Sequence, residues 1–268
     1  MSAAAVDRAP LHEALQTLAG RIAGMIRDLP DTNIQIPRTE WTVGEAAAHL
    51  AVTKGWAVRV FTGEDHLRYG DGTIDSLAPT NARYLSEFQE RDGGRLAEVI
   101  VEATESFVQA ASAMPANRMF ETPMGRMDTT TATSYMLTHL MMHGGAIAKA
   151  MRRPYPIDPI HVELALPFLI HAMPLIVDRK AAGHLNACFY LRFRGGSRVA
   201  VTVIDGEAVV ETIPSRRVDC YISADPVAFF LVATGLESHW RLIARGKLMT
   251  WGRRPWLAVR LPTLFVVP

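Results

Sequence analysis

The spacing of the hydrophobic residues changes near Pro156, and this change limits the folds that the chain can adopt. From residue 9 to about residue 151, apolar side chains recur every three to four positions, which is typical of amphipathic helices. After Pro156, short stretches alternate between apolar and polar residues. Turn signals at 195–196 and 205–206 separate them, and the second is a typical two-residue hairpin turn. The sequence therefore predicts a helical part followed by a part with an antiparallel sheet.

Four amphipathic helices with one long connection are predicted in the first part, which favours a four-helix bundle. The T-V-G-E segment at 42–45 is a capping box that marks the start of the second helix. The fourth helix is predicted over about 130–151. The proline-rich segment 152–159 reads as a linker. We therefore expect the α+β class, with a helical bundle at 1–153 and a smaller α+β domain at 154–268.

Composition and charge narrow the possible partners. The formal net charge is only +1, which gives no electrostatic reason to expect binding to nucleic acid or to an anionic membrane. The longest apolar run, 164–177, is broken by prolines and is too short to span a bilayer, and the first ten residues show no secretory signal. Cys188 and Cys220 lack metal-ligand spacing and are expected to be buried, reduced thiols. We therefore expect a cytoplasmic protein without stable membrane association.

Three histidines are the main candidate site residues. His139 and His143 are spaced i, i+4 on the predicted fourth helix, so their imidazoles leave one face about 5–6 Å apart at Cβ. His49 lies about two turns into the second helix, and facing helices of a bundle commonly carry metal sites. Three neutral imidazoles suit Zn, Ni, Fe or Cu and leave a coordination position open. The same spacing also fits histidines on a partly buried helix face without a metal.

Asn81 and Arg83 are candidate substrate-binding residues near the start of the predicted third helix. They follow a loop with Gly70 and Gly72 that can border the site. An arginine there can bind a carboxylate of the substrate or of a thiol through two hydrogen bonds. The alternative is a solvated arginine at a helix start.

Two pairs of motifs resemble known families. The segments W-T-V-G-E-A-A-A-H-L-A at 41–51 and H-L-M-M-H-G-G-A-I-A-K-A at 139–150 resemble the mycothiol-dependent maleylpyruvate isomerase family, which belongs to the DinB-like metal-binding bundles. The segments D-C-Y-I-S-A-D-P-V-A-F-F-L-V-A-T-G at 219–235 and L-I-A-R-G-K-L-M-T-W-G at 242–252 resemble the sterol-carrier-type domain often fused to it. Together the two resemblances cover nearly the whole chain.

The resemblance implies a divalent metal, usually zinc, at the positions of His49, His139 and His143, with mycothiol as the thiol cosubstrate. In isomerase members the first ligand of the helical pair is commonly a glutamate, whereas His139 stands here, as in DinB-like thiol transferases. Ala146 replaces a common aspartate, and Lys149 replaces a common arginine. The metal site therefore carries over, while the choice between isomerisation and thiol transfer stays open.

The sequence thus supports the hypothesis of a zinc-dependent enzyme that uses a low-molecular-weight thiol on an electrophilic small molecule. The alternative, from a different class, is a non-enzymatic metal-binding bundle fused to a lipid or sterol carrier domain. We expect the first domain to carry the metal and the second to supply or cover part of the substrate pocket. The electrophile and the oligomeric state stay open.

Overall fold

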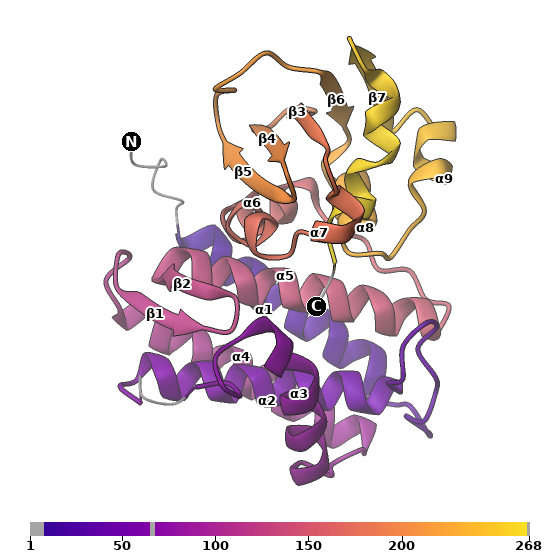
Figure 1. Cartoon of the computed structure of the whole chain (residues 1–268). Coiled ribbons are helices and arrows are strands. Elements are labelled where there is room, and N and C mark those ends of the chain that lie inside the picture. The colour runs from indigo at the N-terminus through magenta and orange to yellow at the C-terminus, as the bar shows by residue number, and fades with distance from the viewer. Residues whose placement is uncertain (1–7, 65–67, 267–268) are drawn as a thin grey trace. The chain divides into compact units, whose positions relative to one another are not determined.

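The computed structural model describes residues 8–64 and 68–266. It separates into two compact units, of which the first ends at Ile157 and the second begins at Asp158 (Figure 1). This division falls slightly after the domain boundary that we expected at residue 153.

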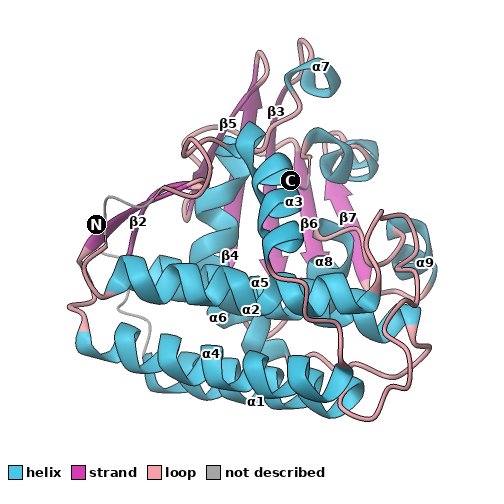
Figure 2. Ribbon diagram, turned by 90° about the horizontal axis from the view of Figure 1, so that it is seen from below, coloured by secondary structure: helices cyan, strands magenta, loops and turns pink. Residues whose placement is uncertain are grey.

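The first unit is a bundle of long helices that lie alongside one another (Figures 1 and 2). Among the four long helices, α2 packs against α4 and α5, and α1 likewise packs against α4 and α5. The predicted four-helix bundle is confirmed. Two shorter elements, the 3₁₀ turn η1 (Ile74–Ser76) and α3 (Leu77–Glu87), lie in the connection between α2 and α4. The four bundle helices are α1 (Arg8–Ile26), α2 (Val43–Phe61), α4 (Gly93–Ala113) and α5 (Thr129–Ala150).

The start of α2 is fixed by the capping box that the sequence predicts. Thr42 Oγ1 accepts a hydrogen bond from the Glu45 backbone N–H at 3.2 Å, and Glu45 Oε2 accepts one from the Thr42 backbone N–H at 2.8 Å. Such a cap contributes about 1 kcal/mol. Because the helix therefore begins at Val43, His49 falls on a defined face of α2.

The start of α5 is fixed in a similar way by a short hairpin. Strands β1 (Met119–Thr122) and β2 (Gly125–Asp128) pair antiparallel, and Asp128 then caps α5 by accepting from the Thr131 N–H at 2.7 Å. This cap sets the phase of the helix that carries His139 and His143.

The second unit is built on a five-stranded sheet in the order β5-β4-β3-β6-β7. Three of its strand pairs are antiparallel, as expected. The pair of β3 and β6 is parallel, because after β5 the chain crosses past β4 and β3 and enters β6 on the other side of β3. The strands are β3 (Asn186–Phe193), β4 (Arg198–Ile204), β5 (Glu207–Glu211), β6 (Cys220–Ala224) and β7 (Leu248–Gly252).

The apolar face of this sheet forms the core of the second unit together with helices. Phe189 and Val201 of the sheet pack with Leu166 of α6 and with Leu261 and Leu264 near the end of the chain. The expected α+β fold is confirmed. The helical elements are α6 (Pro159–Ala172), η2 (Met173–Leu175), α7 (Arg179–Ala182), α8 (Pro226–Ala233), α9 (His239–Ala244), η3 (Pro255–Val259) and η4 (Leu261–Leu264).

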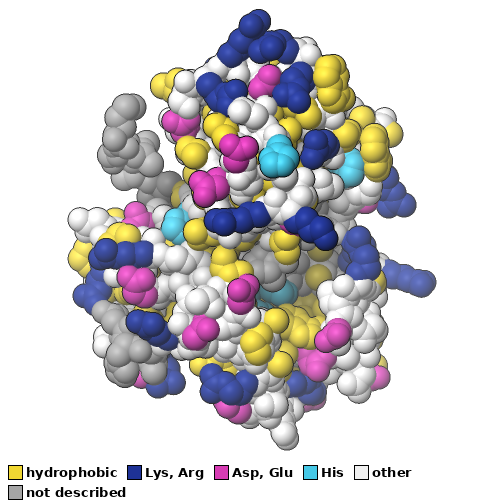
Figure 3. Space-filling model, in the orientation of Figure 1, with side chains coloured by type: hydrophobic (Ala, Val, Ile, Leu, Met, Phe, Trp, Pro, Cys, Tyr) yellow, Lys and Arg dark blue, Asp and Glu magenta, His cyan; other side chains and the backbone are white. Residues whose placement is uncertain are grey.

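Three features of the described residues bear on the expected surroundings of the protein. None of their helices is both long enough and apolar enough to cross a membrane. Cys188 and Cys220 are buried and are not joined in a disulfide. On the face shown in Figure 3, basic and acidic side chains are interspersed over the surface.

Candidate metal centre

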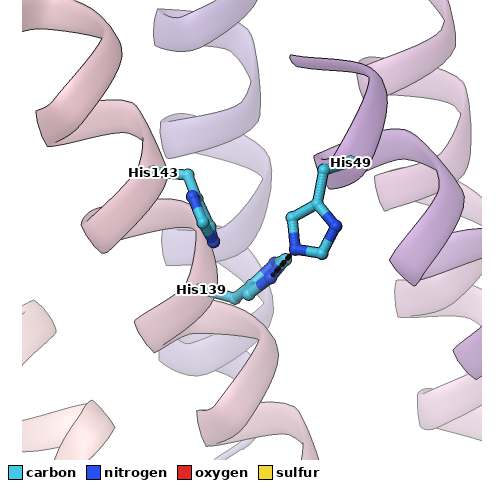
Figure 4. Close-up of side chains that lie close together, drawn as sticks. All are labelled: His49, His139 and His143. Atoms are coloured by element: carbon cyan, nitrogen blue, oxygen red, sulfur yellow. Dashed lines mark hydrogen bonds between the residues drawn. The ribbon is translucent and has the colours of Figure 1, made fainter. Parts of the chain in front are cut away.

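The structure brings His49, His139 and His143 together between α2 and α5 (Figure 4). One nitrogen from each residue can be chosen so that all three lie within 4.8 Å of one another. The ring centroids are 4.7 Å apart for His49 and His139, and 4.5 Å apart for His139 and His143. Three imidazoles from two helices therefore point toward a common volume.

The distance between two of the nitrogens shows how closely the site is packed. Nε2 of His49 lies 2.8 Å from Nε2 of His139, which is hydrogen-bond distance. Two imidazole nitrogens on a tetrahedral zinc ion lie about 3.3 Å apart. The two rings therefore need to separate by about 0.5 Å to share an ion, which rotation about the side-chain torsions can supply.

Burial keeps the three imidazoles uncharged. His49 and His139 are only 5% and 4% exposed. Desolvation, followed by repulsion from neighbouring positive groups, holds the pKa of both side chains well below the usual value of 6.5, and the same causes lower the pKa of His143 to about 4. Neutral imidazole is the form that binds metal ions, so the donor set fits a divalent cation at neutral pH.

One further nitrogen of the cluster is unusual. Among the described residues, His139 Nδ1 is buried and has no hydrogen-bond partner. Buried polar atoms of this kind are rare in folded proteins and commonly mark a functional site.

Trp41 and Gly144, which lie in the motifs at 41–51 and 139–150, pack around the cluster. The ring of Trp41 packs against His49 at 4.7 Å and stacks on His143 at 5.6 Å. A Cβ atom at Gly144 would lie 2.7 Å from Tyr155 Cζ and 2.8 Å from Ile22 Cδ1, so only glycine fits behind His143 without a shift. Trp41 was not singled out from the sequence, although it directly precedes the capping box.

Lys54 is a charged neighbour of the site that the sequence analysis missed. It is fully buried in α2, and its Nζ donates to the Leu50 carbonyl at 3.2 Å. Burial lowers the pKa of Lys54 to about 7, and no described acidic side chain contributes to that pKa. The helical period does predict that Lys54 is buried. It lies four residues after Leu50 and seven before Phe61, so it shares a helix face with these two residues, and both are buried.

The structure treats the two candidate substrate residues differently. Asn81 lies within α3, and its Oδ1 accepts a hydrogen bond from the Tyr69 hydroxyl at 2.5 Å. Arg83 is exposed, and its Nη1 lies 3.6 Å from Glu87 Oε1. Its Cζ lies over the ring of Tyr84, 4.7 Å from the ring centroid. Arg83 is therefore held on the surface of α3, while the side chain of Asn81 bonds to the buried Tyr69.

Comparisons with known proteins agree with this fold. The family model of the mycothiol maleylpyruvate isomerase N-terminal domain matches residues 11–148. The crystal structure of the mycothiol-dependent maleylpyruvate isomerase is 11% identical, with a TM-score of 0.50 over 91% of each chain. A histidine-to-alanine mutant of that enzyme matches equally well, at 10% identity and a TM-score of 0.50. At these identities the structural likeness concerns the fold.

Other comparisons add little. The UbiJ-SCP2 ubiquinone synthesis protein is 16% identical and covers 41% of this chain and 93% of its own, but its TM-score of 0.28 is too low to support an argument. No curated protein matches the chain. The sterol-carrier-type character of the second unit thus stays a prediction. Because the family model covers more than half of the sequence, including all three clustered histidines, the chain belongs to the mycothiol maleylpyruvate isomerase family.

Proposed function

We propose that the protein is a metal-dependent enzyme that uses a low-molecular-weight thiol to isomerise, or to transfer the thiol to, an electrophilic small molecule. The observation that carries this proposal is the convergence of three uncharged imidazoles from α2 and α5, of which those of His49 and His139 are buried. We assign His49, His139 and His143 as the metal ligands and zinc as the metal. Imidazole nitrogens with an open fourth position are typical of catalytic zinc sites.

The chain's own residues prepare the site for an anionic reactant. A bound zinc ion would lower the pKa of a coordinated thiol, so that the thiol reacts as a thiolate. The three imidazoles would hold the ion without neutralising its charge, because none of them carries a negative charge. Trp41 packs against His49 and stacks on His143, and the burial of His49 and His139 keeps water away from these two ligands, which strengthens electrostatic interactions there.

Family membership supports a proposal for the identity of the thiol. The solved relative is a mycothiol-dependent enzyme, and we therefore propose mycothiol as the thiol of this chain as well. We keep Arg83 as a candidate for binding a carboxylate of the substrate or of the thiol, because its guanidinium is exposed on the surface of α3. The Arg83→Met variant should then raise KM for a carboxylate substrate with little change in kcat.

Metal content tests the ligand assignment directly. The variants His49→Ala, His139→Ala and His143→Ala should each lose most of the bound metal while staying folded, as judged by elemental analysis and circular dichroism. His184→Ala is the matched control, because His184 is exposed in the second unit and lies outside the cluster. Full metal content in all three site variants would refute the assignment.

Turnover with a panel of electrophiles tests the enzymatic role. We expect activity only when both the metal and a thiol are present, and a strong preference for mycothiol over glutathione. A metal-loaded protein that shows no thiol-dependent turnover, but that copurifies with lipid, would instead support a carrier protein.

A further inference from the structure

Trp41 contacts two of the three candidate ligands from outside the helices that carry them. Its ring centroid lies 4.7 Å from that of His49 and 5.6 Å from that of His143, and the planes of the second pair are only 26° apart. Aromatic rings attract one another at centroid separations of about 4.5–7 Å when they stack with an offset. Because Trp41 precedes α2, a third segment of the chain takes part in holding the histidines of α2 and α5.

His143 depends on this contact more than the other two histidines do. His49 and His139 are buried, and their Nε2 atoms lie at hydrogen-bond distance from each other. His143 is only half-buried, and among the described residues no hydrogen bond holds its ring. Ring contacts fix it instead. The two other imidazoles meet it edge-on, at 5.0 and 4.5 Å, whereas Trp41 stacks on its face.

The loop that carries Trp41, residues 32–42, is fastened to the start of α2 by backbone hydrogen bonds. The first two N–H groups of the helix, those of Val43 and Gly44, donate to the carbonyls of Ile34 and Thr32 at 2.9 Å each. Such groups have no partner within a helix, so the 32–42 loop supplies their acceptors. A Cβ atom at Gly44 would lie 2.7 Å from Thr32 Oγ1, so glycine lets the loop lie this close to the helix.

A second set of hydrogen bonds closes the 32–42 loop on Trp41 itself. The Ile36 N–H donates to the Trp41 carbonyl at 2.9 Å. Gln35 Nε2 donates to the same carbonyl at 3.1 Å and to the Thr39 carbonyl at 2.8 Å. Ile36 is buried and anchors the loop in the core of the first unit. The backbone of Trp41 is therefore fixed before any ligand binds, which removes the cost of ordering it at that moment.

We propose that Trp41 is a positioning residue that aligns the imidazole of His143, and that the 32–42 loop fixes Trp41 for this role. An imidazole nitrogen binds a metal ion through a lone pair in the ring plane, so the orientation of the ring decides whether His143 can share an ion with the other two histidines. Metal-binding histidines are commonly oriented by a hydrogen bond to their second ring nitrogen. Here the stacked indole serves that purpose. The role toward the metal rests on the proposed function, whereas the alignment of the ring does not.

Nuclear magnetic resonance of the full chain can detect this alignment without a metal. Ring protons stacked over an indole resonate at high field, and ¹H–¹³C spectra of ¹³C-histidine protein, recorded with a chelator, resolve them once His143→Gln assigns the His143 signals. We expect high-field signals in the unchanged chain and a shift to lower field in Trp41→Leu. Gln35→Leu keeps the indole but removes the hydrogen bonds of the Gln35 amide, so it should shift the same signals in the same direction by less. Trp56→Leu is the control, because Trp56 packs against Tyr69 and no described ring contact joins it to a candidate ligand.

Zinc affinity, measured by competition with a chromophoric chelator, provides the second readout. Loss of a group that orients a metal ligand typically weakens binding by about 10–100-fold. We expect this loss for Trp41→Leu, recovery of most of the affinity in Trp41→Phe, which keeps an aromatic ring, and no change in Trp56→Leu. Unchanged His143 signals in Trp41→Leu would overturn the inference, as would an equal loss of affinity in Trp41→Leu and Trp56→Leu. If Trp41→Leu does not fold, the His143 signals of Gln35→Leu decide in its place. Failure of the unchanged chain to bind zinc would instead refute the proposed function, and the ring signals would still decide the inference.

Discussion

The buried ammonium group of Lys54 should make the bundle less stable at neutral pH, and its removal should stabilise the protein. Burial lowers the pKa of Lys54 from 10.5 to about 7. At about 1.4 kcal/mol per pH unit, this difference corresponds to about 5 kcal/mol. A domain is typically stable by only about 5–15 kcal/mol, so the effect is large.

The sign of the pH dependence follows from proton uptake. Between the two pKa values the unfolded chain binds the lysine proton and the folded chain does not, so stability rises with pH. The destabilisation is fully present below about pH 7 and disappears as the pH approaches about 10.5. Relative to the unchanged chain, Lys54→Met should therefore gain about 5 kcal/mol at about pH 6 and about 2 kcal/mol at about pH 9.

This gain can be measured by urea unfolding of the metal-free protein. Hydrogen exchange of peptides from α2 and α5 serves as the readout that assigns the gain to the first unit. Measurements above about pH 6 keep the three histidines neutral in both proteins. Lys180→Met is the control, since Lys180 is exposed and a surface substitution changes stability by no more than about 0.5 kcal/mol. A gain that does not vary with pH, or a variant that is less stable at every pH, would refute the reasoning.

Three further predictions concern the thiols, the first unit and the packing behind the site. The Cys188→Ala/Cys220→Ala variant should keep its thiol-dependent turnover in steady-state kinetics, because both thiols are buried in the sheet and burial raises their pKa; lost activity would point to an internal nucleophile. A chain that ends at Ile157 should keep the metal by elemental analysis, since every clustered histidine precedes that residue. Gly144→Ala should destabilise the bundle by about 1–3 kcal/mol in urea unfolding, because its new Cβ has no room. Gly20→Ala, with no atom within 4 Å of its new Cβ, should instead stabilise the bundle by about 0.5–1 kcal/mol. Equal effects of the two variants would contradict the close packing behind His143.

The features that the sequence predicts well are those fixed by local patterns. The capping box places the start of α2 at Val43, and the i, i+4 spacing puts His139 and His143 on one face of α5. Each of these depends on residues within a turn or two of each other, so helical geometry is enough to predict them. The change of period near Pro156 likewise depends only on neighbouring residues and predicts the two kinds of structure correctly.

The features that the sequence does not predict depend on contacts between distant segments. The Tyr69 hydroxyl bonds to Asn81 of α3 while its ring packs against Trp56 of α2, and no local pattern in the sequence defines these contacts. Lys54 is a similar case, because the period places it on the buried face while its charge argues for exposure. Only the packing of α2 against its neighbours decides between these two expectations.

The charges around the histidines connect this packing to the proposed chemistry. The three candidate ligands are neutral, and the positive charge of Lys54 lowers the pKa of all three. A divalent ion in this cluster would keep its full charge, whereas a glutamate in place of His139, common in isomerase members by the resemblance above, would cancel one unit of it. In a site of low effective dielectric, that unit is worth several kcal/mol for an anion a few ångströms away. As a metal ligand in the proposed function, His139 would therefore favour thiolate formation more strongly than a carboxylate ligand would, and Lys54 would act in the same direction whenever it is protonated.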